Sequence, residues 1–202
     1  MNVIHLLAFC GMLSPILYTI MWILGGYLDP EYSHIRQDVS SLIAIDAPNK
    51  KLLDKFIISS STLLFIFYLG LYWGINNATG SAIAPILFVI AGFLGLLVAI
   101  FFPLDANGEL ATTRGKMHLI LISISGILTI AGMVFLWFQL AADAVWSTFA
   151  TFSLISAIFS LIFVIATSAA TKSSYLGLVE RFMVSTYQIY YFVLALMVFL
   201  TN

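Results

Sequence analysis

Three short polar segments hold most of the residues of this 202-residue chain that could bind an anion or move a proton. The first segment, residues 32–40, has the sequence YSHIRQDVS. If this segment is helical, His34 and Asp38 lie one turn apart. The same spacing separates Arg36 from Ser40. A histidine beside a carboxylate can act as an acid, a base or a metal ligand, and arginine suits bidentate contact with phosphate.

The second and third segments contain a similar mixture of groups. Asp105 follows the third long apolar run of the chain. Arg114 and His118 lie one turn apart on the helix expected next, so they share a face of it. Glu180 and Arg181 stand at the start of the last apolar run. The catalytic candidates are therefore His34, Asp38, Asp105 and His118, and the ligand-binding candidates are Arg36, Ser40, Arg114, Glu180 and Arg181.

The elements that must position these residues are long apolar runs. Hydrophobic residues make up 62% of the chain and charged residues 8%, whereas a soluble domain carries about a quarter charged residues. So short a chain could not bury this much apolar surface in one soluble core, so the bilayer must solvate most of it. Runs of about 20 apolar residues can cross a bilayer as helices. Six runs qualify, at residues 4–28, 55–75, 82–102, 117–140, 145–170 and 182–200.

These runs predict an all-α, polytopic transmembrane bundle of six helices, forming a single domain over residues 1–202. In the first loop, Ile35, Val39 and Leu42 recur with helical spacing. A helix with one apolar face can lie in the plane of the membrane interface. We therefore expect a short interfacial helix in the first loop.

The basic residues are distributed unevenly among the loops. With six spans, all eight Lys and Arg residues fall on one side of the membrane, in three connections or, for Lys55, just beyond one. The connections at residues 76–81 and 141–144 hold none. The positive-inside rule then places the charged loops in the cytoplasm and both termini outside, for a multi-pass protein of the cell membrane.

Composition and motif spacing argue against several kinds of site. Eight basic and nine acidic residues provide no basic surface for nucleic acid, and the lone Cys10 allows no intramolecular disulfide or paired-cysteine metal site. The four catalytic candidates could ligate a metal, but no HExxH or similar spacing supports one. His5 and His118 are expected near opposite membrane faces, so they could not share a haem. We therefore expect no metal and no cofactor.

Several of these segments resemble one protein family. Residues 32–40, residues 102–105 and His118, together with Gly11 and Pro15, resemble the domain-of-unknown-function 998 family, whose members are six-span membrane proteins of bacteria and archaea. The resemblance covers essentially the whole chain. More distantly, the layout is similar to the Frag, DRAM and Sfk membrane proteins, some of which are linked to lipid remodelling or lipid asymmetry. The resemblance implies six spans and, by analogy alone, a lipid-related role.

Three functions remain open at this point. The first is binding of a lipid headgroup or small anionic ligand in a polar pocket on one membrane face, through Arg36, Arg114 and Arg181. The second is a membrane-embedded lipid-modifying enzyme, a hydrolase with or without a metal ion, using the two histidines with Asp38 and Asp105. The third is a structural or partner-binding role, in which loop ion pairs and headgroup contacts hold three helical hairpins together. Membrane lipids are the expected partners, and no nucleic acid is expected.

Overall fold

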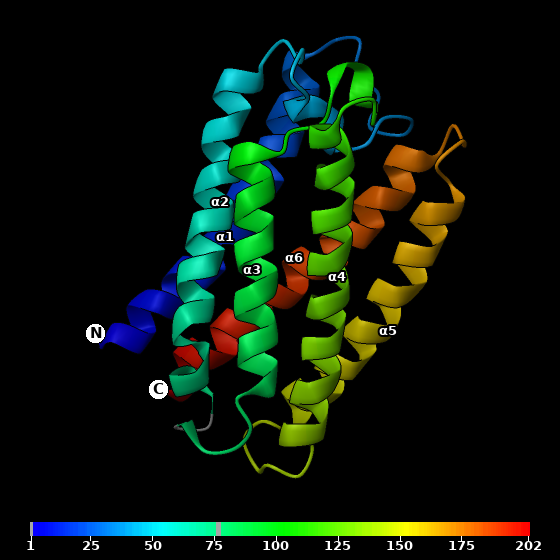
Figure 1. The fold of residues 1–202 in the computed structure, drawn as a ribbon. Coiled ribbons are helices and arrows are strands. Elements are labelled where there is room, and N and C mark those ends of the chain that lie inside the picture. The colour runs from blue at the N-terminus through cyan, green and yellow to red at the C-terminus, as the bar shows by residue number, and fades with distance from the viewer. Residues whose placement is uncertain (1, 76–77) are drawn as a thin grey trace.

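Six long α-helices make up most of the computed structural model, which describes residues 2–75 and 78–202 (Figure 1). Each helix is long and apolar enough to cross a membrane, and the described residues include no strand. The predicted all-α bundle of six spans is therefore confirmed. The helices are α1 (Val3–Leu28), α2 (Lys50–Gly74), α3 (Ile83–Phe101), α4 (Thr113–Leu140), α5 (Ser147–Ala169) and α6 (Leu176–Thr201).

The observed helix ends agree with the predicted spans to within two residues, with three exceptions. Helices α2, α4 and α6 begin earlier than predicted, at Lys50, Thr113 and Leu176. Each of these early starts adds polar or charged residues at the charged end of a helix. The apolar run marks only the part of a helix that lies in hydrocarbon, whereas the helical hydrogen bonds continue into the interface.

The helices form a ring in chain order. Each helix packs against its neighbours in the sequence, and α6 closes the ring on α1. Consecutive helices run in opposite directions, so the connections α1–α2, α3–α4 and α5–α6 meet at one end and both termini lie at the other (Figure 1). We call the charged end the polar cap, and define it as residues 29–49, 102–112 and 170–175.

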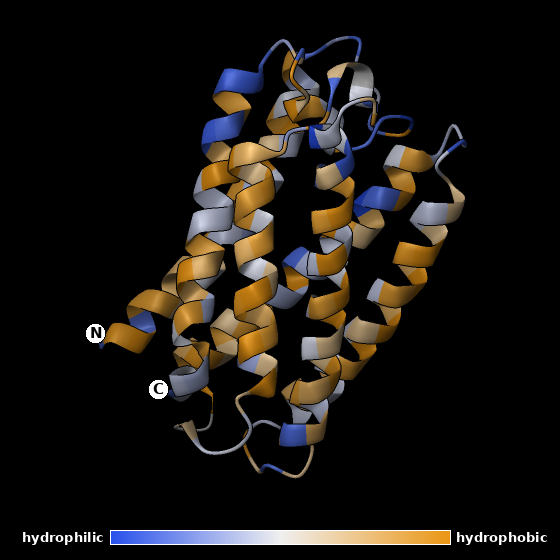
Figure 2. Cartoon of the chain, viewed as in Figure 1, coloured by the Kyte–Doolittle hydropathy of each residue, from blue (hydrophilic) through white to orange (hydrophobic). Residues whose placement is uncertain are grey.

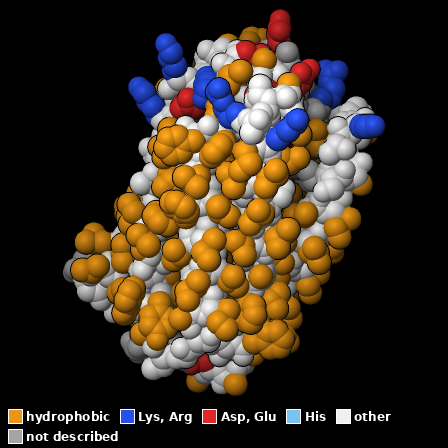
Figure 3. Space-filling model, viewed as in Figure 1, with side chains coloured by type: hydrophobic (Ala, Val, Ile, Leu, Met, Phe, Trp, Pro, Cys, Tyr) orange, Lys and Arg blue, Asp and Glu red, His pale blue; other side chains and the backbone are white. Residues whose placement is uncertain are grey.

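A band of apolar side chains surrounds the bundle below the polar cap. Figure 2 shows hydrophobic residues along all six helices and hydrophilic residues concentrated at the cap. Figure 3 shows apolar side chains covering most of the face in view. Ile127, Phe138 and Ile165 expose 61%, 67% and 61% of their surface. An apolar surface of this extent would associate in water, so lipid is its natural solvent.

Aromatic rings and small residues fill the interior of the ring. Phe88 of α3 stacks on Tyr190 of α6 with ring centroids 6.0 Å apart, and a Cβ at Gly132 of α4 would lie 2.9 Å from the Phe88 ring. Ser14 and Ser60 link α1 to α2, because each hydroxyl donates to the carbonyl of the other, at 2.8 and 2.9 Å. Close packing and interhelical hydrogen bonds hold helices together in lipid, where the hydrophobic effect does not.

The first loop differs from the prediction because it contains no interfacial α-helix. It forms turns and one 3₁₀ helix, η1 (Ser40–Ile43). In an α-helix the carbonyl of His34 would accept from the N–H of Asp38. That carbonyl instead accepts from Arg181 of α6 at 2.6 Å, and the N–H of Ser41 donates to the Asp38 carboxylate at 2.9 Å. Side chains therefore bond to backbone groups that would have bonded to each other in an α-helix.

Candidate functional site

The loops of the polar cap are joined by backbone hydrogen bonds. The N–H of Ile45 in the first loop donates to the carbonyl of Leu104 in the second loop at 3.1 Å. The N–H of Leu178, in the first turn of α6, donates to the carbonyl of Ile35 at 3.0 Å. The first loop is therefore bonded both to the second loop and to the start of α6, and the candidate residues lie in or directly below this assembly.

Arg181 is buried beneath the first loop. Its side chain is 9% exposed, and one guanidinium nitrogen donates to the carbonyls of His34, Gln37 and Gly177 at 2.6, 3.0 and 2.8 Å. The other terminal nitrogen donates to the hydroxyl of Tyr32. These donors are occupied by the protein itself, so the geometry gives Arg181 a role in holding the loop.

Two carboxylates bond to the backbone of the first loop. Glu180 of α6 accepts from the N–H of Val39 at 2.6 Å. Asp38 accepts from both the N–H and the hydroxyl of Ser41. Both acidic side chains therefore serve donors at the start of η1, and Glu180 adds a second connection between α6 and the first loop.

Asp105 likewise accepts hydrogen bonds within the second loop. It accepts from the N–H of Thr112 at 2.7 Å and from the Thr112 hydroxyl at 2.6 Å. The two hydrogen bonds from Thr112 hold the pKa of Asp105 below its usual range, because they stabilise the charged form. Thr112 also caps α4, as its side chain accepts from the N–H of Gly115 at 3.3 Å.

His118 joins three segments of the chain. It is 5% exposed. Its Nδ1 lies 2.7 Å from the carbonyl oxygen of Phe102, and its Nε2 lies 3.2 Å from the hydroxyl of Ser40. A carbonyl can only accept, so in neutral His118 the proton is on Nδ1 and Nε2 is the acceptor. The hydroxyl of Ser40 is then the donor to Nε2.

His34 has a different environment. Its ring meets the edges of Trp22 and Tyr32, with centroids 5.7 and 5.4 Å away. Its Nδ1 is buried without a hydrogen-bond partner among the described residues. Burial, and secondly the charge of Arg181, lower the pKa of His34. Both effects disfavour the charged form of the His34 ring.

The candidate residues are brought to one end of the bundle but not into the pairs that helical spacing suggested. Asp38 bonds to Ser41 and Asp105 bonds to Thr112, while the described hydrogen bonds of the two histidines involve neither carboxylate. No group of three or more His, Cys, Asp or Glu side chains among the described residues could hold a metal ion.

Two of the ligand-binding candidates, Arg36 and Arg114, lie on the surface. Both side chains are exposed, as are those of Lys51, Lys55, Lys116 and Lys172. Lys50 is paired with Asp54 at 2.7 Å. Figure 3 shows Lys and Arg side chains around the edge of the polar cap, directly above the apolar band. Basic groups thus border the part of the protein that lies in hydrocarbon.

Two contributors to the cap were missed by sequence reasoning. The hydroxyl of Tyr32 donates to the carbonyl of Asp38 at 2.6 Å and accepts from Arg181, so it connects the loop to α6. Tyr32 lies in the segment that resembles the family, and this position was the one indication in the sequence that it contributes to the cap. The other contributor is the carbonyl of Phe102, which fixes His118. A backbone acceptor leaves no signal in side-chain identity.

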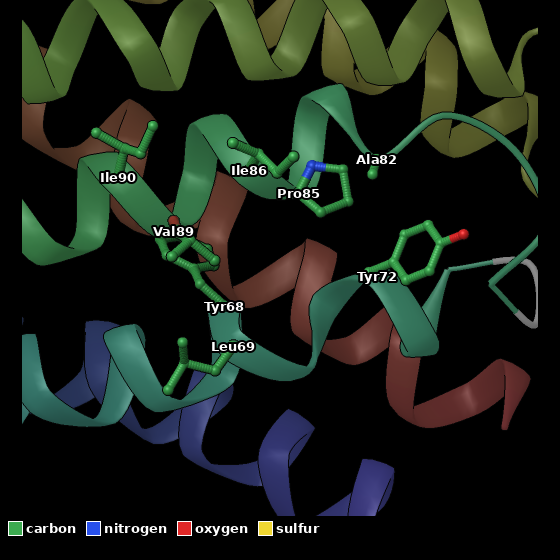
Figure 4. Close-up of a pocket in the computed structure, with 8 residues that line it drawn as sticks. All are labelled: Tyr68, Leu69, Tyr72, Ala82, Pro85, Ile86, Val89 and Ile90. Carbon is green, nitrogen blue, oxygen red and sulfur yellow. The ribbon is translucent and has the colours of Figure 1, made fainter.

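An apolar groove in the spanning region was also not predicted. It lies between α2 and α3, away from the polar cap, and has a volume of about 300 Å³ (Figure 4). Its lining suits hydrocarbon more than a charged ligand. The lining residues are Tyr68, Leu69, Tyr72, Ala82, Pro85, Ile86, Val89 and Ile90.

Comparison with known proteins gives one match. A family model described as "Protein of unknown function (DUF998)" matches residues 12–197. No curated protein and no solved structure matches the chain. The matched range includes the first and second loops of the cap, the four catalytic candidates and all of the ligand-binding candidates.

Proposed function

This chain belongs to the DUF998 family, and we propose that it binds phosphate-bearing headgroups of anionic lipids at the edge of its polar cap. The supporting observation is the contrast between three acidic candidates that are bonded to the protein and two arginine candidates that are exposed. Asp38, Asp105 and Glu180 are bonded to donors of the cap itself. Arg36 and Arg114 are exposed at its edge.

Lipid phosphates are the anions that these cations meet first. Helices that cross the bilayer place the edge of the cap at the level of the headgroups, because the apolar band ends there. A guanidinium can bind a phosphate through two parallel N–H···O bonds. Each Lys or Arg near an anionic membrane surface contributes about 1 kcal/mol of binding. We therefore expect selectivity for anionic over zwitterionic lipids.

The buried candidates support this surface from within. Arg181 and Glu180 bond to the first loop, and Ser40 bonds to His118. We assign Arg181 and Glu180 to positioning the loop that carries Arg36. This differs from direct ligand contact by Arg181, because its terminal nitrogens already donate to protein oxygens.

The same charge distribution supports an orientation, with the polar cap in the cytoplasm of a cell membrane and both termini outside. Loops rich in Lys and Arg are retained in the cytoplasm, and the cytoplasmic leaflet carries anionic lipid. A cysteine placed at exposed Ala111, in a chain whose Cys10 is replaced, should react with an impermeant maleimide only in opened cells. Reaction in intact cells would contradict this orientation.

The binding proposal is tested by titrating purified protein with short-chain phosphatidylglycerol and phosphatidylcholine and counting bound lipids by native mass spectrometry. The double variant Arg36→Ala/Arg114→Ala should bind phosphatidylglycerol roughly 25-fold more weakly, from about 2 kcal/mol for the two cations. Phosphatidylcholine binding should not change. Added salt should weaken phosphatidylglycerol binding to the native chain.

The matched control is Glu109→Gln, which removes an exposed acidic group of the same cap. This variant should bind phosphatidylglycerol at least as tightly as the native chain. Equal affinity of the native chain for the two lipids would refute the proposal.

A further inference from the structure

Ser40 and His118 have the arrangement of a nucleophile and its general base, and we propose that this pair cleaves carboxylic ester bonds of membrane lipids. Ser40 begins η1 in the first loop, and His118 lies in the second turn of α4. Their side chains meet at 3.2 Å although 78 residues separate them in sequence. The contact joins the two segments on which the family resemblance rests.

The direction of the hydrogen bond is the one that nucleophilic catalysis requires. The carbonyl of Phe102, 2.7 Å from Nδ1 of His118, accepts a hydrogen bond from the single N–H group of the neutral ring. This leaves the lone pair of Nε2 directed at the Ser40 hydroxyl, so the imidazole can take the serine proton. The fixed Nδ1–H···O bond has the orienting role that a carboxylate has in other serine hydrolases.

Burial disfavours the protonated ring that forms during reaction, and the charge of Asp38 offsets part of that cost. Asp38 interacts electrostatically with His118, and its negative charge stabilises an imidazolium. Asp38 does not bond to the ring, because it bonds to Ser41. His118 is buried, whereas Ser40 is only half-buried. The base is therefore shielded from water while the nucleophile keeps an exposed side.

The depth of the pair indicates the substrate class. His118 lies one helical turn, about 6 Å along the axis, from Arg114 towards the hydrocarbon. If Arg114 is at the level of lipid phosphates, Ser40 and His118 are near the level of the ester groups that join acyl chains to glycerol. This choice of substrate rests on the proposed headgroup binding, whereas the activation of Ser40 rests on the bonded pair alone.

The reaction balances with water as the one co-reactant. The Oγ of Ser40 bonds to the ester carbonyl carbon and its proton passes to Nε2 of His118. The bond from that carbon to the glycerol oxygen then breaks, and the oxygen takes the proton from Nε2, which releases a lysolipid and leaves an acyl-Ser40 ester. Water attacks this ester and gives a proton to Nε2. The proton returns to Oγ as the carbon–Oγ bond breaks, which releases a fatty acid.

The first test uses the full native chain in detergent and a fluorophosphonate probe, which transfers a phosphonyl group to activated serines and carries no lipid headgroup. Peptide mass mapping should find the label on Ser40. The variant His118→Gln can still hydrogen-bond but cannot act as a base, so labelling should slow by about 100-fold or more. The matched control Ser33→Ala, in the same loop, should label at the native rate. Folded protein that takes no label on Ser40 would overturn the proposed pair.

The second test supplies the substrate. Native protein in vesicles of phosphatidylglycerol should release lysolipid and fatty acid in equal amounts, and Ser40→Ala should release neither while its thermal unfolding is recorded in parallel. Labelling of Ser40 without lysolipid release overturns the lipid-ester assignment. A failure of headgroup binding would instead appear as equal affinity for the two lipids with Ser40 labelling intact, so the two proposals can fail separately.

Discussion

The two ends of the bundle reverse the chain by different means. At the end opposite the polar cap, the connection at residues 141–146 is held by near neighbours, since the Asp143 carboxylate accepts from the N–H of Val145 at 2.8 Å. At the polar cap, Arg181 donates to the carbonyl of His34, 147 residues away. The connection at residues 141–146 is a local turn, whereas the polar cap is an assembly of distant segments.

This difference indicates what the cap contributes beyond turning the chain. A helical hairpin needs only a short connection, as residues 141–146 demonstrate. Long-range hydrogen bonds that order a 21-residue connection, residues 29–49, must overcome the conformational entropy of that segment. We infer that the bonds of the cap serve to hold a defined surface at the headgroup level. The following predictions test this contrast between a long-range cap and a local turn.

The largest effect is expected from Arg181→Ala. This change removes a buried cation and leaves carbonyls of the first loop without their donor. We expect a loss of about 3 kcal/mol in unfolding free energy and faster proteolysis within residues 29–49. Arg181→Lys should be intermediate, because an ammonium cannot reproduce the guanidinium fork. Reversible denaturation in mixed micelles and limited proteolysis measure the two effects.

The exposed Arg36→Ala is the control for charge alone. It should change stability by less than about 0.5 kcal/mol and leave the proteolysis pattern unaltered. If Arg181→Ala behaves in the same way, the long-range bonds do not hold the cap, and the contrast between the two ends fails.

The same contrast explains which features could be predicted from sequence. Lipid allows a spanning segment only to be a helix or part of a closed barrel, so apolar runs were sufficient to find the six helices. The conformation of the first loop depends on partners such as Arg181, which lies more than 140 residues away. Local spacing therefore suggested a bond between His34 and Asp38 that does not form. The bond between His118 and Phe102 depends on a backbone carbonyl, which no side-chain pattern reveals.

At the end opposite the polar cap, Asp143→Ala should have a moderate and local effect. Asp143 accepts from the N–H groups of Val145 and Trp146 at 2.8 and 3.0 Å, just before α5. Loss of such a cap costs about 1 kcal/mol. Proteolysis of residues 29–49 should stay at the native rate, because no long-range bond of the cap is touched. Faster cleavage there would show that the two ends are coupled.

A smaller effect is expected from Tyr190→Phe in the spanning region between the two ends. The hydroxyl of Tyr190 lies 2.8 Å from that of Ser153, which donates to the carbonyl of Met133 at 3.0 Å. Polar contacts within a membrane bundle contribute about 0.6 kcal/mol on average, so the variant should lose about that much stability. Tyr175→Phe, at an exposed tyrosine of the cap, should lose none. A larger loss for Tyr190→Phe than for Asp143→Ala would reverse this ranking.

The subtlest test of the cap is the pH dependence of stability. The pKa of His34 is lower in the folded chain than its usual value of 6.5, so the unfolded chain binds the proton more tightly. The stability that neutral His34 contributes is then fully present above pH 6.5. It is lost as the pH falls towards the pKa of His34 in the folded chain. Asp105 has the same sign in a lower window, since its pKa lies below the usual 3.8.

Unfolding midpoints measured from pH 8 to pH 3 separate these two groups. His34→Gln should remove the part of the decline that begins near pH 6.5 and leave the acid part. Asp105→Asn should do the reverse, because it removes the carboxylate that Thr112 stabilises. Each variant is the control for the other. If the His34→Gln profile kept the native decline below pH 6.5, His34 would take up a proton as readily in the folded chain as in the unfolded one. The fold would then not shield its ring.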